Sequence, residues 1–243
     1  ARNRIRFTIM ACDEFTTEVP EHSELEPAKF WDKRARGLGA SHGKPSVSCG
    51  EENLLKLPGD PYHEENILIH EFAHAIHEMG LNTIDPTFQE RLETIFAQAI
   101  KKGLWKGTYA ATNEMEYWAE GVQSWYGSNR QNDFEHNHVN TRKELQAYDP
   151  ALAKLIEEVF GKRKWVYRKP SERKPASAHM KGFDLSMEPV FTWPQRLLDW
   201  QKLYERGLVS LAPEDAPEIA PLPIDDKEAM RSLFSDREKQ GGG

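Results

Sequence analysis

The first sixty residues carry short apolar runs typical of β-strands. In residues 4–10, RIRFTIM, every second residue is apolar, which predicts a strand with one buried face that opens the fold. A helix is expected over residues 26–37, because proline suits a first helical turn and glycine a helix end. Residues 45–55, PSVSCGEENLL, predict a second strand followed by a loop.

The middle of the chain has the spacing of apolar residues that helices show. Residues 64–79 are apolar on nearly every side, so we expect a central, buried helix that ends at Gly80. Further helices are predicted over residues 85–103, 113–126 and 150–161. The chain is therefore expected to be an α+β protein, mostly helical, with a small N-terminal β-sheet.

The composition changes after residue 168. Eight of the 15 prolines lie beyond it, in clusters such as APEDAPEIAPLP at 212–223, a density that suits an extended connector. One amphipathic helix, predicted over residues 194–206, interrupts this region and is expected to dock on the main body. We therefore divide the chain into a main domain, residues 1–168, and a proline-rich C-terminal extension, residues 169–243.

Charge and hydropathy exclude two kinds of partner. The 243 residues are 38% hydrophobic, enough for one sizeable core, and carry a formal charge of −7 with basic residues scattered among acidic ones. We therefore expect no nucleic-acid partner. No apolar run is long enough for a membrane span. The chain starts at Ala1 and ends in three glycines, which suggests a processed or trimmed chain that has lost a leader or a neighbouring domain.

The two cysteines, Cys12 and Cys49, each follow a segment that resembles a strand. If those strands are neighbours, the thiols can form a disulfide, which indicates an exported protein. Two isolated buried thiols are the alternative, and sequence spacing alone does not decide between them. We expect an extracellular or periplasmic location.

Candidate chemistry is concentrated in HEFAH, residues 70–74. A helix turns by about 100° per residue, so His70 and His74 project from one face and can share a metal ion. Glu71 lies beside the pair and can act as a general base on a water held by that ion. The alternative is two core histidines that bond to backbone carbonyls. Two imidazoles and a carboxylate in an otherwise apolar helix are costly to bury, and a metal offsets that cost.

Catalytic zinc usually takes three protein ligands, so a third must be found. His77 lies two helical turns from His70, too far to share its ion, and we expect it to pack or to support the site from outside. Residues 109–121, YAATNEMEYWAEG, supply Glu116 and Glu120 on one helix face. Either could bind the ion, while the other accepts the free N–H of a ligating histidine. Without the upstream motif, an ordinary solvated acidic face would be the better interpretation.

The two motifs together resemble a known family. HEFAH, followed about forty residues later by YAATNEMEYWAE, is similar to the C-terminal catalytic domain of the anthrax lethal factor family of zinc metallopeptidases. The resemblance covers about residues 45–165 and implies a zincin-like metallopeptidase fold for the main domain. Residues after 168 have no counterpart in it. The other toxin domains are absent, so toxin substrates and host partners do not carry over.

Carried over position by position, the resemblance implies specific roles. Glu71 would be the general base, and the hydroxyl of Tyr109 would stabilise the transition state. Glu120 would lie behind the ligands and support them. The implied zinc ligands are His70, His74 and Glu116.

These residues predict a zinc-dependent metallopeptidase in which Glu71 assists attack by a Zn²⁺-bound water on a peptide or protein substrate. Two alternatives remain open, namely a zinc hydrolase of a non-peptide amide or ester, and a catalytically silent metal-binding module. The strand and loop at residues 46–57 are expected to pair with an extended peptide. His136 and His138 could line the rim of a pocket or form a second metal site, but we favour their interpretation as loop residues outside the site.

Overall fold

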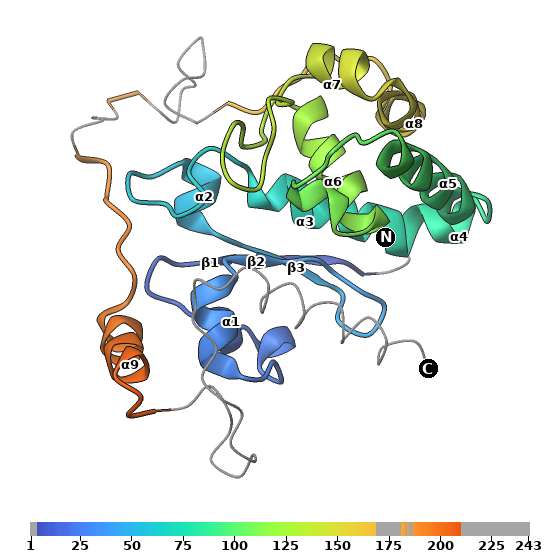
Figure 1. The fold of residues 1–243 in the computed structure, drawn as a ribbon. Helices are drawn as coiled ribbons and strands as arrows, with labels where there is room; N and C mark the ends of the chain where they lie inside the picture. The colour runs from blue at the N-terminus through green and yellow to red at the C-terminus, as the bar shows by residue number, and fades with distance from the viewer. Residues whose placement is uncertain (1–3, 169–180, 183, 185–186, 210–243) are drawn as a thin grey trace.

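The protein has an α+β architecture, in which a small sheet is packed between helices (Figure 1). This computed structural model describes residues 4–168, 181–182, 184 and 187–209. The predicted class, α+β and rich in helix with a small N-terminal sheet, is confirmed at this level.

The sheet has three strands in the order β1-β3-β2. β1 (Arg6–Met10) runs parallel to β3 (Ser46–Gly50), and β2 (Gly37–Leu38) runs antiparallel to it. β2 was not predicted, because its residues were assigned to the end of the first helix. That helix, α1 (Ala28–Arg34), ends earlier and lies on the opposite side of the sheet from most other helices (Figure 1).

The central position of β3 overturns one prediction. β1 pairs along the whole of one edge of β3, and β2 pairs with Ser48 and Cys49 on the other, so β3 lacks the continuous free edge that an added peptide strand needs. The following residues form α2 (Glu51–Leu55) rather than a loop. The strands with a free edge in this sheet are β1 and β2.

The predicted buried face of β1 is also wrong. Phe7 and Ile9 are 51% and 42% exposed, although their alternation is that of a half-buried strand. The reason is that the long helix above the sheet, α3 (Ile67–Ile76), packs against β2 and β3 and reaches β1 mainly through Phe72. The rings of Phe7 and Phe72 meet edge to face, with their centroids 5.0 Å apart.

Helices α4 to α8 lie on the same side of the sheet as α3 (Figure 1). α5, α6 and α8 match the ranges predicted for the middle of the chain to within three residues. Their bounds, with those of the short helices, are α4 (Asn82–Ile84), α5 (Phe88–Lys101), α6 (Glu114–Trp125), α7 (Arg142–Tyr148) and α8 (Pro150–Phe160).

α3 does not stop at Gly80 as predicted. The helical path continues through a π-helical segment, His77–Leu81, and then α4. It ends at Asp85, whose extended conformation (φ −132°, ψ 92°) is the one that a following proline favours. Pro86, rather than the glycine, therefore terminates the helix. At the other end, the side chain of Asn66 caps α3 by accepting from the Ile69 N–H at 2.9 Å.

α6 is the most deeply buried helix, with every residue from Tyr117 to Trp125 in the interior. Trp118 and Trp125 fill much of the main core. Gly121 allows α8 to approach, because a Cβ at this position would lie 2.6 Å from Leu152 Cδ2 and 2.9 Å from Ile156 Cδ1.

The predicted helix in the C-terminal region is present as α9 (Gln195–Glu205). It packs against α1, buries Leu197 and Tyr204, and its Arg196 pairs with Glu18 at 2.7 Å. The proline-rich stretches at 169–180 and 210–223 lie outside the described residues.

Cys12 and Cys49 are both free thiols in the structure, so of the two alternatives the disulfide is not formed. Burial, followed by the hydrogen bond with Glu51 and the charge of Glu52, raises the pKa of Cys12 to about 12. Within the described residues, no helix has the length and apolar character needed to cross a membrane. The extracellular or periplasmic location stays a prediction.

The close packing of α6 on α8 generates a stability prediction. Gly121→Ala should lower the free energy of unfolding by about 1–3 kcal/mol, because the new methyl group overpacks the contact with Leu152 and Ile156. Gly80→Ala is the matched control, since a Cβ there meets nothing within 4 Å and alanine favours helix. Urea denaturation of the two variants measures both values, and equal effects would contradict the packing account.

Candidate metal centre

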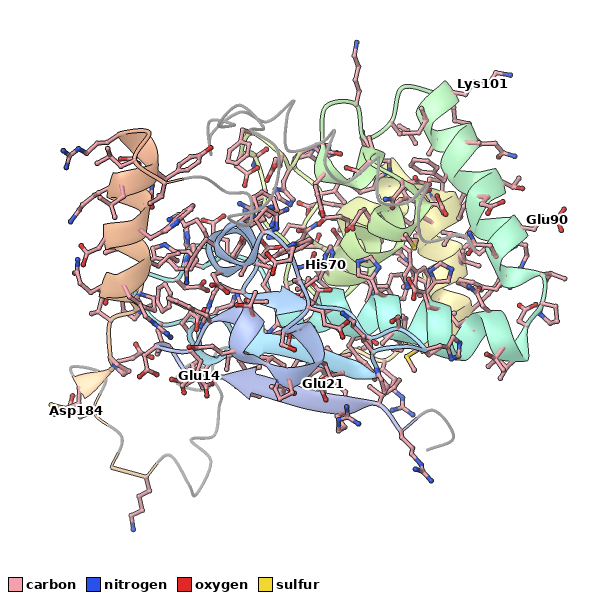
Figure 2. All side chains as sticks on the ribbon, turned by 90° about the horizontal axis from the view of Figure 1, so that it is seen from below. Glu14, Glu21, His70, Glu90, Lys101 and Asp184 are labelled. Atoms are coloured by element: carbon pink, nitrogen blue, oxygen red, sulfur yellow. The ribbon has the colours of Figure 1, made fainter. Side chains whose placement is uncertain are left out.

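Two imidazoles from α3 face one another. His70 and His74 lie one turn apart on the same face, and their Nε2 atoms are separated by 3.1 Å. Both side chains are mostly buried, and Figure 2 labels His70 near the middle of the molecule. The helix therefore presents two nitrogen donors toward a single point.

A carboxylate from α6 reaches the same point. Glu116 Oε2 lies 3.0 Å from His70 Nε2 and 3.5 Å from His74 Nε2. Asn113 caps α6 by accepting from the Glu116 N–H at 2.8 Å, which fixes where this side chain leaves the backbone. Of the two candidate third donors, Glu116 is thus the one next to both histidines.

The three donors fit one divalent ion. Nitrogen and oxygen ligands about 2.0–2.1 Å from a tetrahedral zinc lie ~3.3 Å from one another. The three separations here are 3.0, 3.1 and 3.5 Å. The alternative of two core histidines requires hydrogen bonds to backbone carbonyls. Among the described residues, neither Nε2 atom makes such a bond. Two imidazoles and one carboxylate are also a ligand set that catalytic zinc sites use.

The charges of the three groups depend on one another. Burial lowers the pKa of His70, but the hydrogen bond and charge of Glu116 outweigh it and raise that pKa well above its ordinary value. The pKa of His74 is raised for the same reasons. Burial raises the pKa of Glu116, yet the two histidines hold it far below its usual range. A divalent cation would compensate the carboxylate in the same way, with both imidazoles neutral.

Glu71 lies between the histidines and β2. A Cβ at Gly39, just after β2, would be 3.3 Å from Glu71 Oε2 and 3.2 Å from His74 Cβ. A Cβ at Gly37 would lie only 2.3 Å from Ile67 Cγ2. The two glycines therefore let the backbone around β2 run close to α3. Burial raises the pKa of Glu71, and the neighbouring histidines offset part of this effect.

Tyr109 comes from the 3₁₀ turn that precedes α6 (Tyr109–Ala111). Its N–H donates to the carbonyl of Glu135 at 2.7 Å, and its ring centroid lies 6.3 Å from that of His70. Burial, followed by the negative charge of Glu116, raises the pKa of Tyr109 well above its ordinary value. The hydroxyl therefore keeps its proton and can act as a hydrogen-bond donor beside the centre.

Behind His70, the structure differs in part from the sequence prediction. Glu120 Oε1 lies 3.6 Å from His70 Nδ1, but Gln123 Oε1 is closer, at 2.8 Å. Gln123 was not predicted. It follows Glu116 by seven residues and Glu120 by three, so the helical spacing that selected the glutamates also places it on the same face.

Three further histidines, His77, His136 and His138, have different environments. His77 Nε2 lies 2.7 Å from Gln89 Oε1, and its ring packs near Trp118, so it is outside the ligand set as predicted. His138 is exposed with its ring against Tyr148, also as predicted. His136 lies in a loop, but it is buried and 3.4 Å from Glu120. The sequence did not predict this contact with Glu120, which itself lies 3.6 Å from His70 Nδ1.

Comparison of the chain with family profiles, with curated proteins and with solved structures finds no match. The resemblance stated above therefore depends on the two motifs alone.

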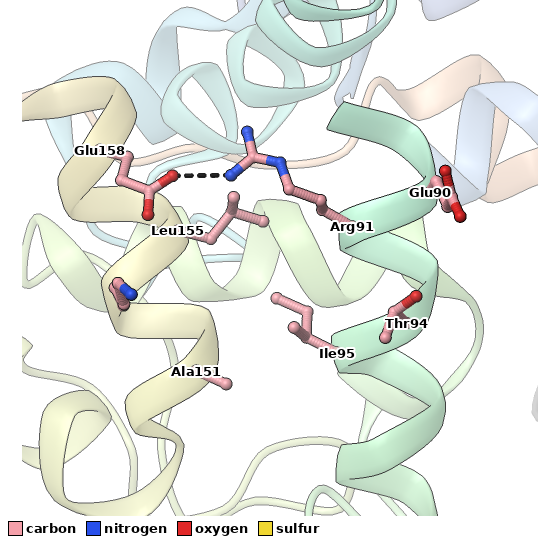
Figure 3. Close-up of a pocket in the computed structure, with 8 residues that line it drawn as sticks. Glu90, Arg91, Thr94, Ile95, Ala151, Leu155 and Glu158 are labelled. Carbon is pink, nitrogen blue, oxygen red and sulfur yellow. Dashed lines mark hydrogen bonds and ion pairs between the residues drawn. The ribbon is translucent and has the colours of Figure 1, made fainter. Parts of the chain in front are cut away.

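A separate groove of about 520 Å³ lies between α5 and α8 (Figure 3). It contains none of the residues of the metal centre. Ile95 and Leu155 form its apolar floor, and Arg91 spans its rim by pairing with Glu158 at 2.7 Å. We assign it no function.

The geometry predicts which histidines hold the metal. His74→Gln should weaken Zn²⁺ binding by more than about 100-fold. The reason is that loss of a residue that only hydrogen-bonds to a metal ligand already lowers metal affinity by about 10–100-fold. His77→Gln should leave the affinity unchanged, since His77 faces Gln89 on the far side of the helix path. Competition with a chromogenic chelator measures both constants. Equal affinities for the two variants would contradict the proposed centre.

Proposed function

We propose that the chain is a zinc-dependent metallopeptidase whose main domain, residues 1–168, has a zincin-like fold. One observation carries the proposal. Three donors from two separate helices, His70, His74 and Glu116, lie within 3.5 Å of one another. The two helices thus bring together two imidazoles and one carboxylate, a ligand set that catalytic zinc sites use, with Glu71 next to His70 in the sequence.

The residues around the centre have distinct tasks in peptide hydrolysis. A zinc ion held there would polarise the scissile carbonyl and lower the pKa of water toward about 7. Glu71 accepts the proton of the attacking water and returns it to the amine as the C–N bond breaks. Tyr109, protonated and buried, donates a hydrogen bond to the carbonyl oxygen as negative charge develops on it. Gln123 and Glu120 hold the ring of His70 from behind.

The edge strand β2 favours a peptide over other substrates. One of its edges pairs with β3, and the other is free within the three-stranded sheet. Gly39, directly after β2, lies against Glu71. An extended peptide that hydrogen-bonds to this edge would run past the general base, which is how a protease binds a backbone irrespective of sequence. β2 thus takes the place of residues 46–57, which are unsuited to the task.

The function is tested by activity on unfolded protein substrates. The zinc-loaded chain should cleave a denatured protein library, and a chelator should abolish this cleavage. Glu71→Gln should lower kcat by about 10²–10⁴-fold while zinc stays bound, because the general base is lost. Mass spectrometry of the fragments and metal analysis give the two readouts. Glu64→Gln, an exposed position before α3, is the matched control and should cleave as the parent does.

Other outcomes distinguish the alternatives. Hydrolysis of small esters or amides without cleavage of the library would indicate a non-peptide hydrolase. Zinc binding with no hydrolysis of any of these substrates would indicate a catalytically silent metal-binding module. If Glu71→Gln cleaved at the full rate of the parent, the assignment of Glu71 as general base would be wrong.

Tyr109 provides an independent test of transition-state stabilisation. Tyr109→Phe should lower kcat by about 10²–10³-fold with little change in KM or in zinc affinity, because the lost donor acts only as charge develops. Tyr126→Phe, at the other end of α6, removes a hydroxyl remote from the centre and should leave kcat unchanged. Steady-state kinetics on a cleaved peptide compares the two, and a change confined to KM would reassign Tyr109 to substrate binding.

A further inference from the structure

A second cluster of buried acidic and basic groups lies behind the metal centre. Glu65, Glu120 and His136 are 4%, 2% and 6% exposed, and each offers a ligand atom within 4.8 Å of the other two. By donor type and spacing the cluster could hold a cation. The positive charge that balances its two carboxylates could come from a metal ion or from basic side chains of the protein.

Basic and amide side chains of the protein already face these carboxylates. Arg130 Nε lies 3.1 Å from Glu65 Oε1, so a guanidinium, which also pairs with Asp133 and Glu135, already faces this carboxylate. The second oxygen of Glu65 accepts from Gln123 Nε2 at 3.2 Å. Glu120 Oε2 accepts from Asn129 Nδ2 at 2.9 Å. With these donors in place, a metal ion would have to displace Arg130 and the amides, so we do not assign one here.

His136 is the remaining positive group of the cluster, and it lies between two carboxylates. Its Nδ1 is 2.9 Å from Asp133 Oδ1, and its Nε2 is 3.4 Å from Glu120 Oε2. Within the described part of the chain Nε2 makes no hydrogen bond, and Glu120 faces it at the distance of an ion pair. Burial lowers the pKa of His136, but the neighbouring Glu120 carboxylate outweighs this effect and raises it to about 9. Both ring nitrogens therefore carry protons at neutral pH.

Glu120 connects His136 to the metal centre. Its Oε2 faces His136, while its Oε1 lies 3.6 Å from His70 Nδ1. The other nitrogen of that imidazole, Nε2, is the one directed at Glu116 and His74. A shift of the Glu120 carboxylate would consequently move or reorient the ring that supplies a metal donor.

We propose that His136 is a positioning residue, which holds Glu120 in place from behind so that Glu120 and Gln123 together orient His70 for metal binding. This inference rests on the proposed function in one respect, that His70 is a metal ligand. It adds to the site a residue sixty-six positions further along the chain. His136 touches no substrate and takes no part in proton transfer.

Two isosteric variants separate positioning from a general structural role. The amide of glutamine overlays Nε2 of histidine, and the amide of asparagine overlays Nδ1. His136→Gln keeps a donor for Glu120, whereas His136→Asn keeps only the contact with Asp133. We expect His136→Asn to weaken Zn²⁺ binding by about 10–100-fold and His136→Gln by only a few-fold. His138→Asn, two residues away and exposed, is the control and should bind zinc as the parent does.

The readouts are chelator competition for Zn²⁺ and the visible absorption spectrum of the Co²⁺-loaded full-length chain. A change of ligand orientation in His136→Asn should alter the Co²⁺ spectrum, while His136→Gln and His138→Asn keep the parental spectrum. Asp133→Asn covers the case in which His136→Asn does not fold. Asp133 lies at an exposed position. The substitution keeps the side-chain oxygen Oδ1 that faces His136 and removes the negative charge. A few-fold loss of affinity is expected from it.

The outcomes are distinct. Parental affinity and spectrum in His136→Asn, or in Asp133→Asn if the first does not fold, overturn the inference and leave the proposed function intact. Equal losses in His136→Asn and His136→Gln also overturn it, because the contact with Glu120 would not be the cause. Two zinc ions bound per parent chain, with one lost in His136→Asn, would replace it with a second metal site. A parent that binds no metal would overturn both proposals.

Discussion

The contact between α3 and α6 is the constraint on which the centre depends. The Trp118 indole N–H on α6 donates to the carbonyl of Ala73 on α3 at 2.9 Å, in the middle of the helix pair. Gln123 joins the same two helices a second time, because its amide donates to the Asn66 carbonyl at 3.2 Å while its Oε1 faces His70. With the helices held at these two points, a carboxylate from the first turn of α6 and two imidazoles from α3 converge.

Burial explains why so many polar groups surround this helix pair. Charged side chains in a core are stable only if they are paired or bound to a metal, and two buried carboxylates behind the centre have partners of opposite charge. Arg130 neutralises Glu65, and His136 neutralises Glu120. The aromatic core under α6 keeps water away from these pairs and strengthens them. Stability and the orientation of the ligands thus come from the same contacts.

The sequence predicted those features that depend on local spacing. Residues four apart on a helix share a face, so His70, His74 and the candidate pair Glu116 and Glu120 could be identified without coordinates. Features that depend on which elements are neighbours could not be predicted. The exposure of Phe7 is decided by how far α3 extends over the sheet, and the burial of His136 by the folding of its loop onto α6. A periodic pattern describes a face of an element and not what covers it.

The short strand β2 has a consequence for how the site can vary. The backbone at Gly39 is so close to Glu71 and His74 that even one methyl group would fill the space between them. An alanine there would press on both side chains, so His74, Glu71 or the backbone at Gly39 would have to shift. The positions of two candidate site residues therefore depend on a residue that contributes no side chain of its own.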